Sequence, residues 1–429
     1  MTDDRVFLKC AWRLIPFIVV LYIVNYIDRV NIGFAALTMN RDLGFSASAY
    51  GFGAGIFVVS YALFQIPASV SVALVGARRA VFAILLSWGV VSAATAFIKD
   101  ATSFAVLRFL LGLAEAGFFP GMIFYLSLWF PQNYRARFTA GLMAAIPLAF
   151  IVGAPISTLI LEMDGVLGLH GWQWLFLIEG LPACILALVV LLVFPDGPRA
   201  ASWLSADEKQ IIASRLAKDD SELNPNLWPA LLDPRVYALA VVNFGVQIGL
   251  YGTTLWLPLI VQDMGFNNRT TGFLVAGVYI VGMAGMTVWA RSSDFKRERV
   301  WHVVTANLLS AGGFLGASVA QNHLVALFAL ACACTGILAH LATFWTVPSS
   351  FLRGTAAAGG IALVNTISSF GGFFGATLIG VLKDETGGYS APMAMLAGAF
   401  VFTALIMLAL GRAMAPRAAM QQAPARGDL

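Results

Sequence analysis

The chain has 429 residues, of which 59% are hydrophobic and only 11% charged, and its formal net charge at neutral pH is +4. Soluble globular domains are usually about 25% charged, so this composition, with a mean hydropathy of +0.83, excludes that class. Forty-one glycines suit tightly packed membrane helices, where small residues let backbones approach closely. We therefore expect an all-α integral membrane protein with the lipid bilayer as its surroundings and no nucleic-acid partner.

Twelve apolar stretches separated by short polar loops are long enough to cross a bilayer as helices. The first of them is too long for the apolar region of a cleavable signal peptide. The stretches lie at roughly residues 12–39, 49–74, 80–98, 101–130, 138–161, 173–195, 235–261, 270–291, 300–320, 323–349, 355–382 and 391–412.

The distribution of Lys and Arg predicts how these spans are oriented. Of the 26 basic residues, 20 fall on the loops that share a side with both termini. The opposite side has only Arg41, Lys99, Arg269 and Lys383, and the last two bases, Arg29 and Arg108, lie inside spans. Because cytoplasmic loops carry an excess of Lys and Arg, we expect both termini in the cytoplasm of a bacterium and the spans in its inner membrane.

A long polar stretch divides the spans into two sets of six. We expect a first half at 1–195, a cytoplasmic linker at 196–234, a second half at 235–414 and a cytoplasmic tail at 415–429. Ser205 and Glu208 in the linker have the spacing of a capping box, which predicts an amphipathic helix at the membrane surface.

The two halves also repeat one another. The segment WFPQNYRARFTA at 129–140 aligns without gaps on WTVPSSFLRGTA at 345–356, with Trp, Arg, Thr and Ala matching at an offset of 216 residues. Two six-span halves related by a repeat are the expected layout of an alternating-access transporter.

Several motifs in the right order give the chain a family resemblance. They are NYIDRVNIGF (25–34), YGFGAGIF (50–57), VGARR (75–79), LRFLLGLAEAGFFPG (107–121), HGWQWLFLIEGLP (170–182), FWTVP (344–348) and GTAAAGGIALVN (354–365). With these motifs the chain resembles the major facilitator superfamily, and within it the anion:cation symporter family of bacterial organic-acid permeases for galactonate, tartrate, phthalate or hydroxyphenylacetate. The resemblance implies twelve transmembrane helices in two pseudo-symmetric halves, and we expect the protein to be a monomer. The resemblance also implies proton-coupled import of a small organic carboxylate, with protons as the coupling ion and no cofactor.

One loop departs from the superfamily pattern G-x-x-x-D-R-x-G-R-R. Between the second and third spans the chain keeps Arg78 and Arg79 but lacks the Asp, whereas the second-half copy at 291–299 keeps an acid, Asp294. We assign these three residues to gating or structure, and a gating ion pair is in doubt for the first half.

The charges predicted inside spans are Asp28, Arg29, Arg108, Glu115 and Glu179, all in the first half. Arg108 and Glu115 are two helical turns apart and share a face, about 10 Å from each other along the axis. Neighbours Asp28 and Arg29 diverge by about 100°, so one can face the pore while the other turns toward an adjacent helix.

Arginine keeps its charge and presents a planar fork that matches a carboxylate. We therefore predict that Arg29, and secondarily Arg108, bind the substrate anion, and that Asp28 and Glu115 couple this binding to protons, as the resemblance also implies. The alternative is that these charges form ion pairs that hold the first six spans together, and both can be true. Glu179, close to the outer end of its span, is assigned mainly to structure.

Other candidates are polar or aromatic residues in apolar spans. Tyr26 and Tyr61 resemble family substrate contacts, although packing alone explains them equally well. Trp345 could wall the substrate, but it belongs to the repeated motif. Asn365 is a stronger candidate, because a buried amide needs a partner that a hydroxylated substrate could supply. Cys332 and Cys334 lack companion ligands, so no metal site is expected.

The function that these observations favour is symport of an organic anion by alternating access. An antiporter or exporter would use the same fold. An integral-membrane enzyme would need a nucleophile–base pair or a metal cluster, and a sensor would need a sizeable soluble domain; the sequence shows neither. An arginine anchor indicates a carboxylate, which could be a sugar acid, a tartrate-like acid or an aromatic acid.

Overall fold

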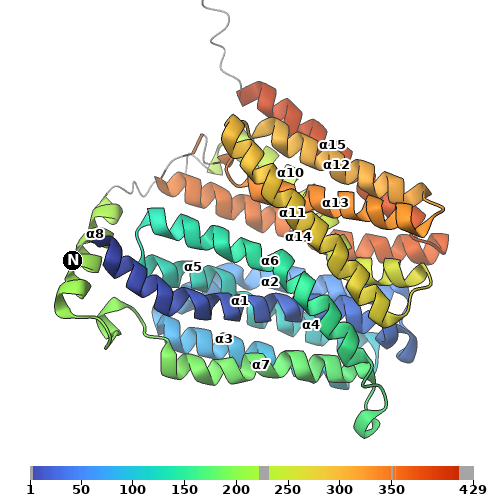
Figure 1. The fold of residues 1–429 in the computed structure, drawn as a ribbon, viewed down its shortest axis with the longest axis horizontal. Coiled ribbons are helices and arrows are strands. Elements are labelled where there is room, and N and C mark those ends of the chain that lie inside the picture. The colour runs from blue at the N-terminus through green and yellow to red at the C-terminus, as the bar shows by residue number, and fades with distance from the viewer. Residues whose placement is uncertain (1–2, 222–230, 349–350, 353, 415–429) are drawn as a thin grey trace, which may run out of the picture.

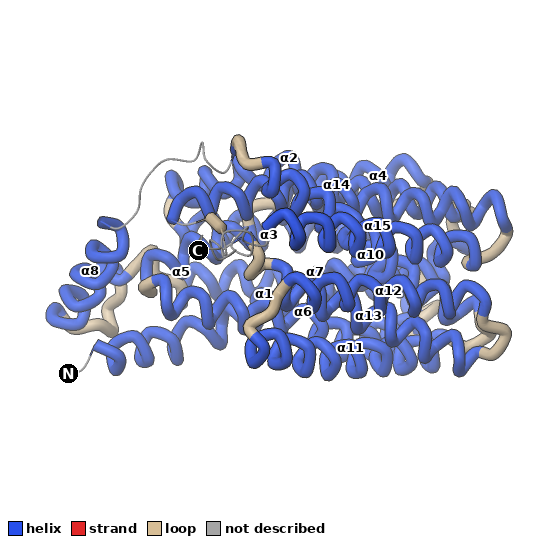
Figure 2. Tube along the Cα trace, turned by 90° about the horizontal axis from the view of Figure 1, so that it is seen from above, coloured by secondary structure: helices blue, strands red, loops and turns tan. Residues whose placement is uncertain are grey.

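The computed structural model describes residues 3–221, 231–348, 351–352 and 354–414, which contain helices and no strand (Figures 1 and 2). The expected tail at 415–429, residues 222–230 of the expected linker, and residues 349–350 and 353 of the second repeat copy lie outside the described residues. The first set of helices is α1 (Asp3–Asp42), α2 (Ala47–Val75), α3 (Ala77–Ala94), α4 (Ala101–Glu115), α5 (Phe118–Trp129), α6 (Gln132–Leu161), α7 (Gly171–Val193) and α8 (Ala206–Ser221). The second set is α10 (Pro234–Asp263), α11 (Asn268–Lys296), α12 (Val300–Val319), α13 (His323–Phe344), α14 (Gly354–Thr386) and α15 (Ser390–Met414).

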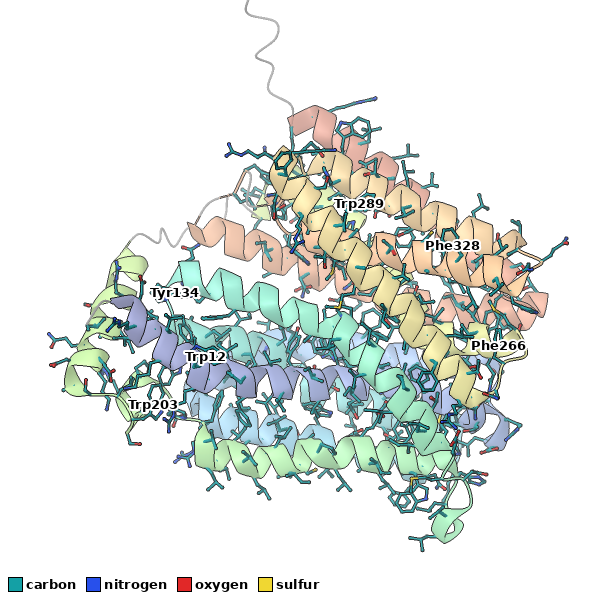
Figure 3. All side chains as sticks on the ribbon, in the orientation of Figure 1. Trp12, Tyr134, Trp203, Phe266, Trp289 and Phe328 are labelled. Atoms are coloured by element: carbon teal, nitrogen blue, oxygen red, sulfur yellow. The ribbon has the colours of Figure 1, made fainter. Side chains whose placement is uncertain are left out.

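The twelve predicted spans correspond to these helices. Among the described residues, eleven spans are long and apolar enough to cross a membrane, with α4 and α5 counted as one, and α6 contributes a shorter apolar stretch at Ala145–Leu161. The all-α membrane fold is therefore confirmed. Large apolar side chains such as Phe328, which is 72% exposed, lie on the outside of the bundle, where lipid surrounds them (Figure 3).

The fourth predicted span is not one continuous helix. It breaks after Glu115, and the chain resumes as α5 at Phe118. Pro120 explains the break, because it has no backbone N–H and its ring would collide with the carbonyl group of residue 116 in a continuous helix. The break leaves Glu115 as the last residue of α4, next to α1.

The helices lie side by side along one direction, and α8 sits across one end of the bundle (Figure 1). Trp12 and Trp203 are at this α8 end, whereas Phe266 is at the opposite end, called the far end below (Figure 3). In the first set, α3 packs on α7, α2 on α4, and α1 on α6 and α7. In the second set, α10 packs on α14, α11 on α13, and α12 on α13 and α15.

The two sets of helices meet at the far end and separate toward the α8 end. One cluster of buried apolar residues spans both sets, from Val30 and Phe104 in the first to Trp256 and Tyr279 in the second. Toward the α8 end the buried residues fall into two clusters, one drawn from residues 6–212 and the other from residues 236–410. This shared core closes the far end.

Closure depends on close packing between α2 and α14. A Cβ on Gly380 would lie 2.3 Å from the backbone oxygen of Ala47, and one on Gly51 would lie 2.4 Å from that of Ala376, so only glycine fits. Just beyond, the Asp384 carboxylate of α14 accepts hydrogen bonds from the backbone N–H groups of Ala47 and Ser48, at 3.0 and 2.8 Å. A carboxylate at a helix N-terminus also interacts favourably with the helix dipole.

Helix α8 is docked on the first set of helices. The predicted capping box is present, because Ser205 N–H donates to Glu208 Oε2 and Glu208 N–H donates to Ser205 Oγ. Lys9 of α1 donates to both carboxylate oxygens of Glu208 at 2.9 Å, and this hydrogen bonding holds the pKa of Glu208 below its usual value. Trp203 stacks on Trp129 of α5, with ring centroids 5.5 Å apart.

Replacing Asp384 with alanine should loosen the far end. Two N–H groups of α2 lose a charged acceptor, at a cost of roughly 1 kcal/mol, which moves the ratio of closed to open molecules about fivefold. Spin labels at Arg41 and Arg269, one in each set of helices, should then report a larger population of long distances. Glu385→Ala, which removes the neighbouring exposed carboxylate, is the control. Identical distance distributions for the two variants would show that Asp384 does not hold the far end closed.

Candidate functional site

A cavity lies between the two sets of helices and is lined by both. Its wall combines two arginines with aromatic and aliphatic side chains: Tyr26, Arg29, Val30, Ala54, Phe57, Arg108, Ile146, Phe150, Leu250, Tyr251, Thr254 and Leu255. An apolar pocket with a few converging polar groups is typical of a small-molecule site.

Arg29 is held by an acid and three aromatic rings. Its Nε donates to Glu115 Oε2 at 2.7 Å, and the side chain of Glu115 is fully buried. The guanidinium carbon also lies 4.5 Å from the ring centre of Tyr61, 5.3 Å from that of Phe57 and 5.5 Å from that of Tyr26. Cation–π contacts of this kind stabilise a guanidinium that has left water.

The carboxylate of Glu115, the acid of this ion pair, has hydrogen-bond donors at only one of its two oxygens. Asn25 Nδ2 donates to the same Oε2 of Glu115 at 2.8 Å, whereas the second oxygen, Oε1, has no hydrogen-bond partner. A buried carboxylate oxygen without a hydrogen-bond donor is energetically costly, so the carboxylate of Glu115 is incompletely satisfied by its neighbours.

Asp28 points away from the cavity, toward α3. Trp88 Nε1 donates to Oδ2 at 2.9 Å, and Ser92 Oγ and Asn31 Nδ2 donate to Oδ1. The side chain is completely buried. Asp28 and Arg29 thus leave α1 in different directions, as the 100° spacing between neighbours requires, and the structure confirms that only the arginine faces the cavity.

Arg108 contributes a second cation to the cavity wall. It is 2% exposed, its guanidinium carbon lies 4.9 Å from the ring centre of Phe57, and its Nε has no hydrogen-bond partner. One turn further along α4, Gly112 allows the helix to approach α2, because a Cβ there would lie 2.2 Å from the backbone oxygen of Phe57. This close approach places Arg108 of α4 against Phe57 of α2, at the cavity wall.

The structure does not bring all predicted site residues to the cavity. Tyr26 lines it, and Tyr61 packs on Arg29 behind the wall. Trp345 packs against Phe344 in the cluster of residues 236–410, and the backbone oxygen of Asn365 accepts from Ser368 and Ser369. Neither belongs to the cavity wall in this conformation, so their substrate contacts stay predictions.

Sequence reasoning missed the contribution of α10. Tyr251 and Thr254 of α10 lie on the cavity wall together with the arginines of α1 and α4. The signal was the polar run YGTT at 251–254 inside an apolar span. It also missed the donors Trp88 and Ser92, which look like ordinary packing residues until α3 is placed against Asp28.

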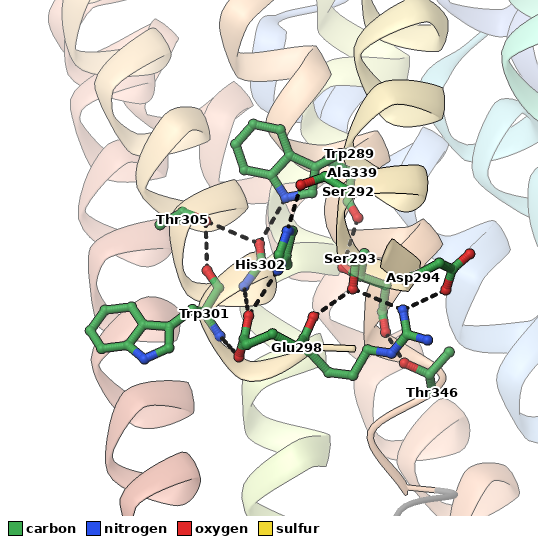
Figure 4. A network of polar contacts seen from close by, with 12 residues as sticks. Trp289, Ser292, Ser293, Asp294, Glu298, Trp301, His302, Thr305, Ala339 and Thr346 are labelled. Carbon is green, nitrogen blue, oxygen red and sulfur yellow. Dashed lines mark hydrogen bonds and ion pairs between the residues drawn. The ribbon is translucent and has the colours of Figure 1, made fainter. Parts of the chain in front are cut away.

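Arg78, Arg79 and Asp294 lie away from the cavity. The two arginines are exposed, and the backbone N–H of Arg78 donates to Asp196, an acid from the connection after α7. Asp294 pairs with Arg299 at 2.7 Å, within a network between α11 and α12 that also joins Glu298 to His302 (Figure 4). The contacts of Arg78 and Asp294 lie within their own halves, and the assignment of the three residues to gating or structure stays a prediction.

The described residues contain no group of three or more His, Cys, Asp or Glu side chains that could hold a metal ion.

Comparison with models of known protein families identifies the family of the chain. The model of the Major Facilitator Superfamily matches residues 18–376. The chain belongs to the major facilitator superfamily. This is a family of transporters, so the interpretation as a transporter rather than an enzyme holds.

Several relatives of this superfamily member are bacterial proteins named as transporters. It is 46% identical over 413 residues to a provisionally named tartrate transporter of Agrobacterium vitis, which covers 96% of this chain and 95% of that one. It is 38% identical to the provisionally named metabolite transport protein NicT of Pseudomonas putida, covering 94% and 93%. It is 39% identical to a quinolone resistance transporter of Acinetobacter baumannii, covering 91% and 92%.

Solved structures share the fold. A bacterial homologue of the human lysosomal transporter Spinster matches with a TM-score of 0.78 at 15% identity, covering 93% of this chain and 96% of that one. A D-xylose–proton symporter matches with a TM-score of 0.75 at 15% identity, covering 92% and 97%. At this identity the likeness concerns the fold.

Breaking the ion pair between Arg29 and Glu115 one partner at a time should destabilise this transporter strongly. Glu115→Ala leaves a buried arginine without a counter-charge, at a cost of about 3–5 kcal/mol, and Arg29→Ala on the same background should recover part of that loss. A double-mutant cycle of unfolding free energies should therefore give a coupling of about 2 kcal/mol or more.

The matched control is the pair of Lys9 and Glu208, whose lysine side chain is 43% exposed. Exposed pairs couple by less than about 1 kcal/mol. Equal coupling in the two cycles would show that Arg29 and Glu115 are not held as a buried pair.

Proposed function

We propose that the protein is a proton-coupled importer of a small organic carboxylate. The observation that carries this proposal is the pair of arginines, Arg29 and Arg108, on the wall of a cavity between the two halves, with Arg29 hydrogen-bonded to the buried acid Glu115. A site with two permanent positive charges favours an anion.

The geometry supports a two-step capture of the substrate. Arg108, whose Nε has no partner, is the cation available to an incoming carboxylate. Arg29 is occupied by Glu115 and becomes free only when Glu115 takes a proton. A substrate carboxylate that replaces Glu115 at Arg29 therefore favours protonation of Glu115, and protonation of Glu115 favours binding of the substrate.

Linkage fixes the sign of the pH dependence. Because the bound state holds more protons than the free state, substrate affinity should rise as pH falls. Asp28, on the opposite side of α1 and held by donors from α3, is a second place where a proton can change the position of α1 relative to α3.

We infer the orientation from the distribution of basic residues, which places the α8 end in the cytoplasm. In this proposal the packed far end faces outward and the conformation is inward-facing. Import then requires the contacts between α2 and α14 to open and close in each cycle.

The substrate class can be narrowed. Two arginines and the hydroxyl groups of Tyr26, Tyr251 and Thr254 around one cavity suit an acid that also carries hydroxyl groups or a second carboxylate. The name of the tartrate transporter relative supports the same class. We therefore infer a hydroxylated organic acid of the tartrate type.

An exporter is the second candidate, since one relative is a quinolone resistance transporter. Uptake into proteoliposomes separates the two. An importer by symport accumulates substrate when the outside is acidic, whereas a proton antiporter accumulates it when the inside is acidic.

The first test is thermal stabilisation of the purified protein by a panel of compounds, comprising tartrate, sugar acids, aromatic acids, neutral sugars and cationic amines. A ligand at 100 times its Kd stabilises the native state by about 2.7 kcal/mol. One class of carboxylates should stabilise the wild type, more strongly at about pH 5.5 than at about pH 7.5.

Arg29→Ala and Arg108→Ala should lose this stabilisation, and Arg79→Ala, which removes an exposed arginine, should keep it. Equal stabilisation of all four proteins, or stabilisation by neutral or cationic compounds alone, would overturn the organic-anion proposal.

A further inference from the structure

Glu179 is a buried acid that the proposed mechanism does not use. It lies on α7 and is 5% exposed. Ser157 Oγ of α6 donates to its Oε1 at 2.7 Å, and its Oε2 has no hydrogen-bond partner. A carboxyl group with one donor for two buried oxygens is incompletely satisfied as an anion.

A single amide connects this acid to Asp28. Asn31 follows Asp28 by one turn of α1, and its Nδ2 donates to Asp28 Oδ1 at 3.2 Å. The same amide lies in contact with the Glu179 carboxyl group, and its Oδ1 has no donor. The cluster therefore contains two buried acids, one amide between them, and two oxygens that lack a donor.

Charge makes an ionised Glu179 unfavourable here. Among the described residues no base forms an ion pair with it, since Arg29 is paired with Glu115 and Arg108 faces the cavity. The titratable group that faces it is Asp28 of α1, and the nearby side chains of α3 and α6, Ser92 and Ser157, do not ionise. An anion would thus be buried without a cation and next to another acid.

A proton on Glu179 removes its unpaired buried charge. It also supplies the hydrogen-bond donor that the two oxygens of the cluster lack. We propose that Glu179 stays protonated and, as a neutral acid, positions the amide of Asn31 so that its NH2 group faces Asp28. This inference rests on the proposed proton coupling through Asp28, and it makes Glu179 a positioning residue rather than a second coupling acid.

The position of the Asn31 amide should affect how readily Asp28 takes up a proton. Donors to the ionised form of a carboxyl group favour that form. Asp28 receives three donors, from Trp88, Ser92 and Asn31. If Asn31 is no longer positioned, the ionised form loses one of them, and the pH profile of transport should move to higher pH.

The test compares two substitutions of Glu179 in proteoliposome uptake of tartrate across a range of pH. Glutamine cannot ionise but keeps an NH2 donor, so Glu179→Gln should keep the pH profile of the wild type. Glu179→Leu removes the donor and should move the half-maximal pH upward by about one unit. The control Glu162→Leu, which removes an exposed acid at the end of α6, should leave the profile in place.

A second variant protects the test against failure of Glu179→Leu to fold. Asn31→Ala removes the positioned amide itself and should cause the same upward shift, and adding Glu179→Gln to it should cause no further shift. Loss of proton dependence in Glu179→Gln would show that Glu179 exchanges its own proton, and a wild-type profile in Glu179→Leu or Asn31→Ala would show that it positions nothing; either result overturns the inference.

Asp28→Asn separates this inference from the proposed function. If Asp28→Asn keeps the proton dependence of the wild type, the proposed coupling through Asp28 fails, and the coupling through Glu115 is not affected. If Asp28→Asn loses the proton dependence while the Glu179 and Asn31 variants match the wild type, only the positioning role fails.

Discussion

The hydrogen-bonded ion pair between Arg29 and Glu115 is the interaction on which the candidate site depends. Removing two charges from water is expensive, and the pair persists only because the arginine also rests on three aromatic rings and the acid accepts a second donor from Asn25. The pair joins α1 to α4 and, in the proposed function, also holds the arginine that the substrate anion binds. The proposal therefore gives one contact both a structural and a functional role.

Neighbouring charged side chains of α1 face different surroundings. Arg29 faces the cavity, whereas Asp28 faces α3 and the cluster that reaches Glu179. Because both groups are fixed to one rigid helix, a change of charge on either side acts on the same element. The far end, closed by α2 against α14, is where such a movement would be transmitted between the halves.

Much of the fold could be predicted from the sequence, because composition, span length and the repeat at an offset of 216 residues are all local patterns. The break between α4 and α5 was missed, although Pro120 was visible, since a proline in an apolar stretch can also sit in a kinked but continuous helix. The hydrogen bonds between Asp384 and the N-terminus of α2 could not be predicted, because they join residues more than 300 positions apart.

The candidate site, like the fold, could be predicted only in part from the sequence. Buried charges stand out in an apolar chain, so Asp28, Arg29, Arg108 and Glu115 could be found without a structure. Their partners could not, because Trp88 and Ser92 resemble ordinary packing residues in the sequence. Which residues share the cavity wall depends on how the halves approach each other, and this explains why Tyr251 was missed.

Proton uptake during substrate binding tests the central claim most directly. Purified protein in weakly buffered detergent solution is mixed with the carboxylate that stabilises it most, and the change in pH is recorded for the wild type and for Glu115→Gln. If the anion displaces Glu115 from Arg29, the wild type should take up about one proton per bound anion and Glu115→Gln should take up none. Equal uptake by the two proteins would contradict the account, because the proton would then bind somewhere other than Glu115.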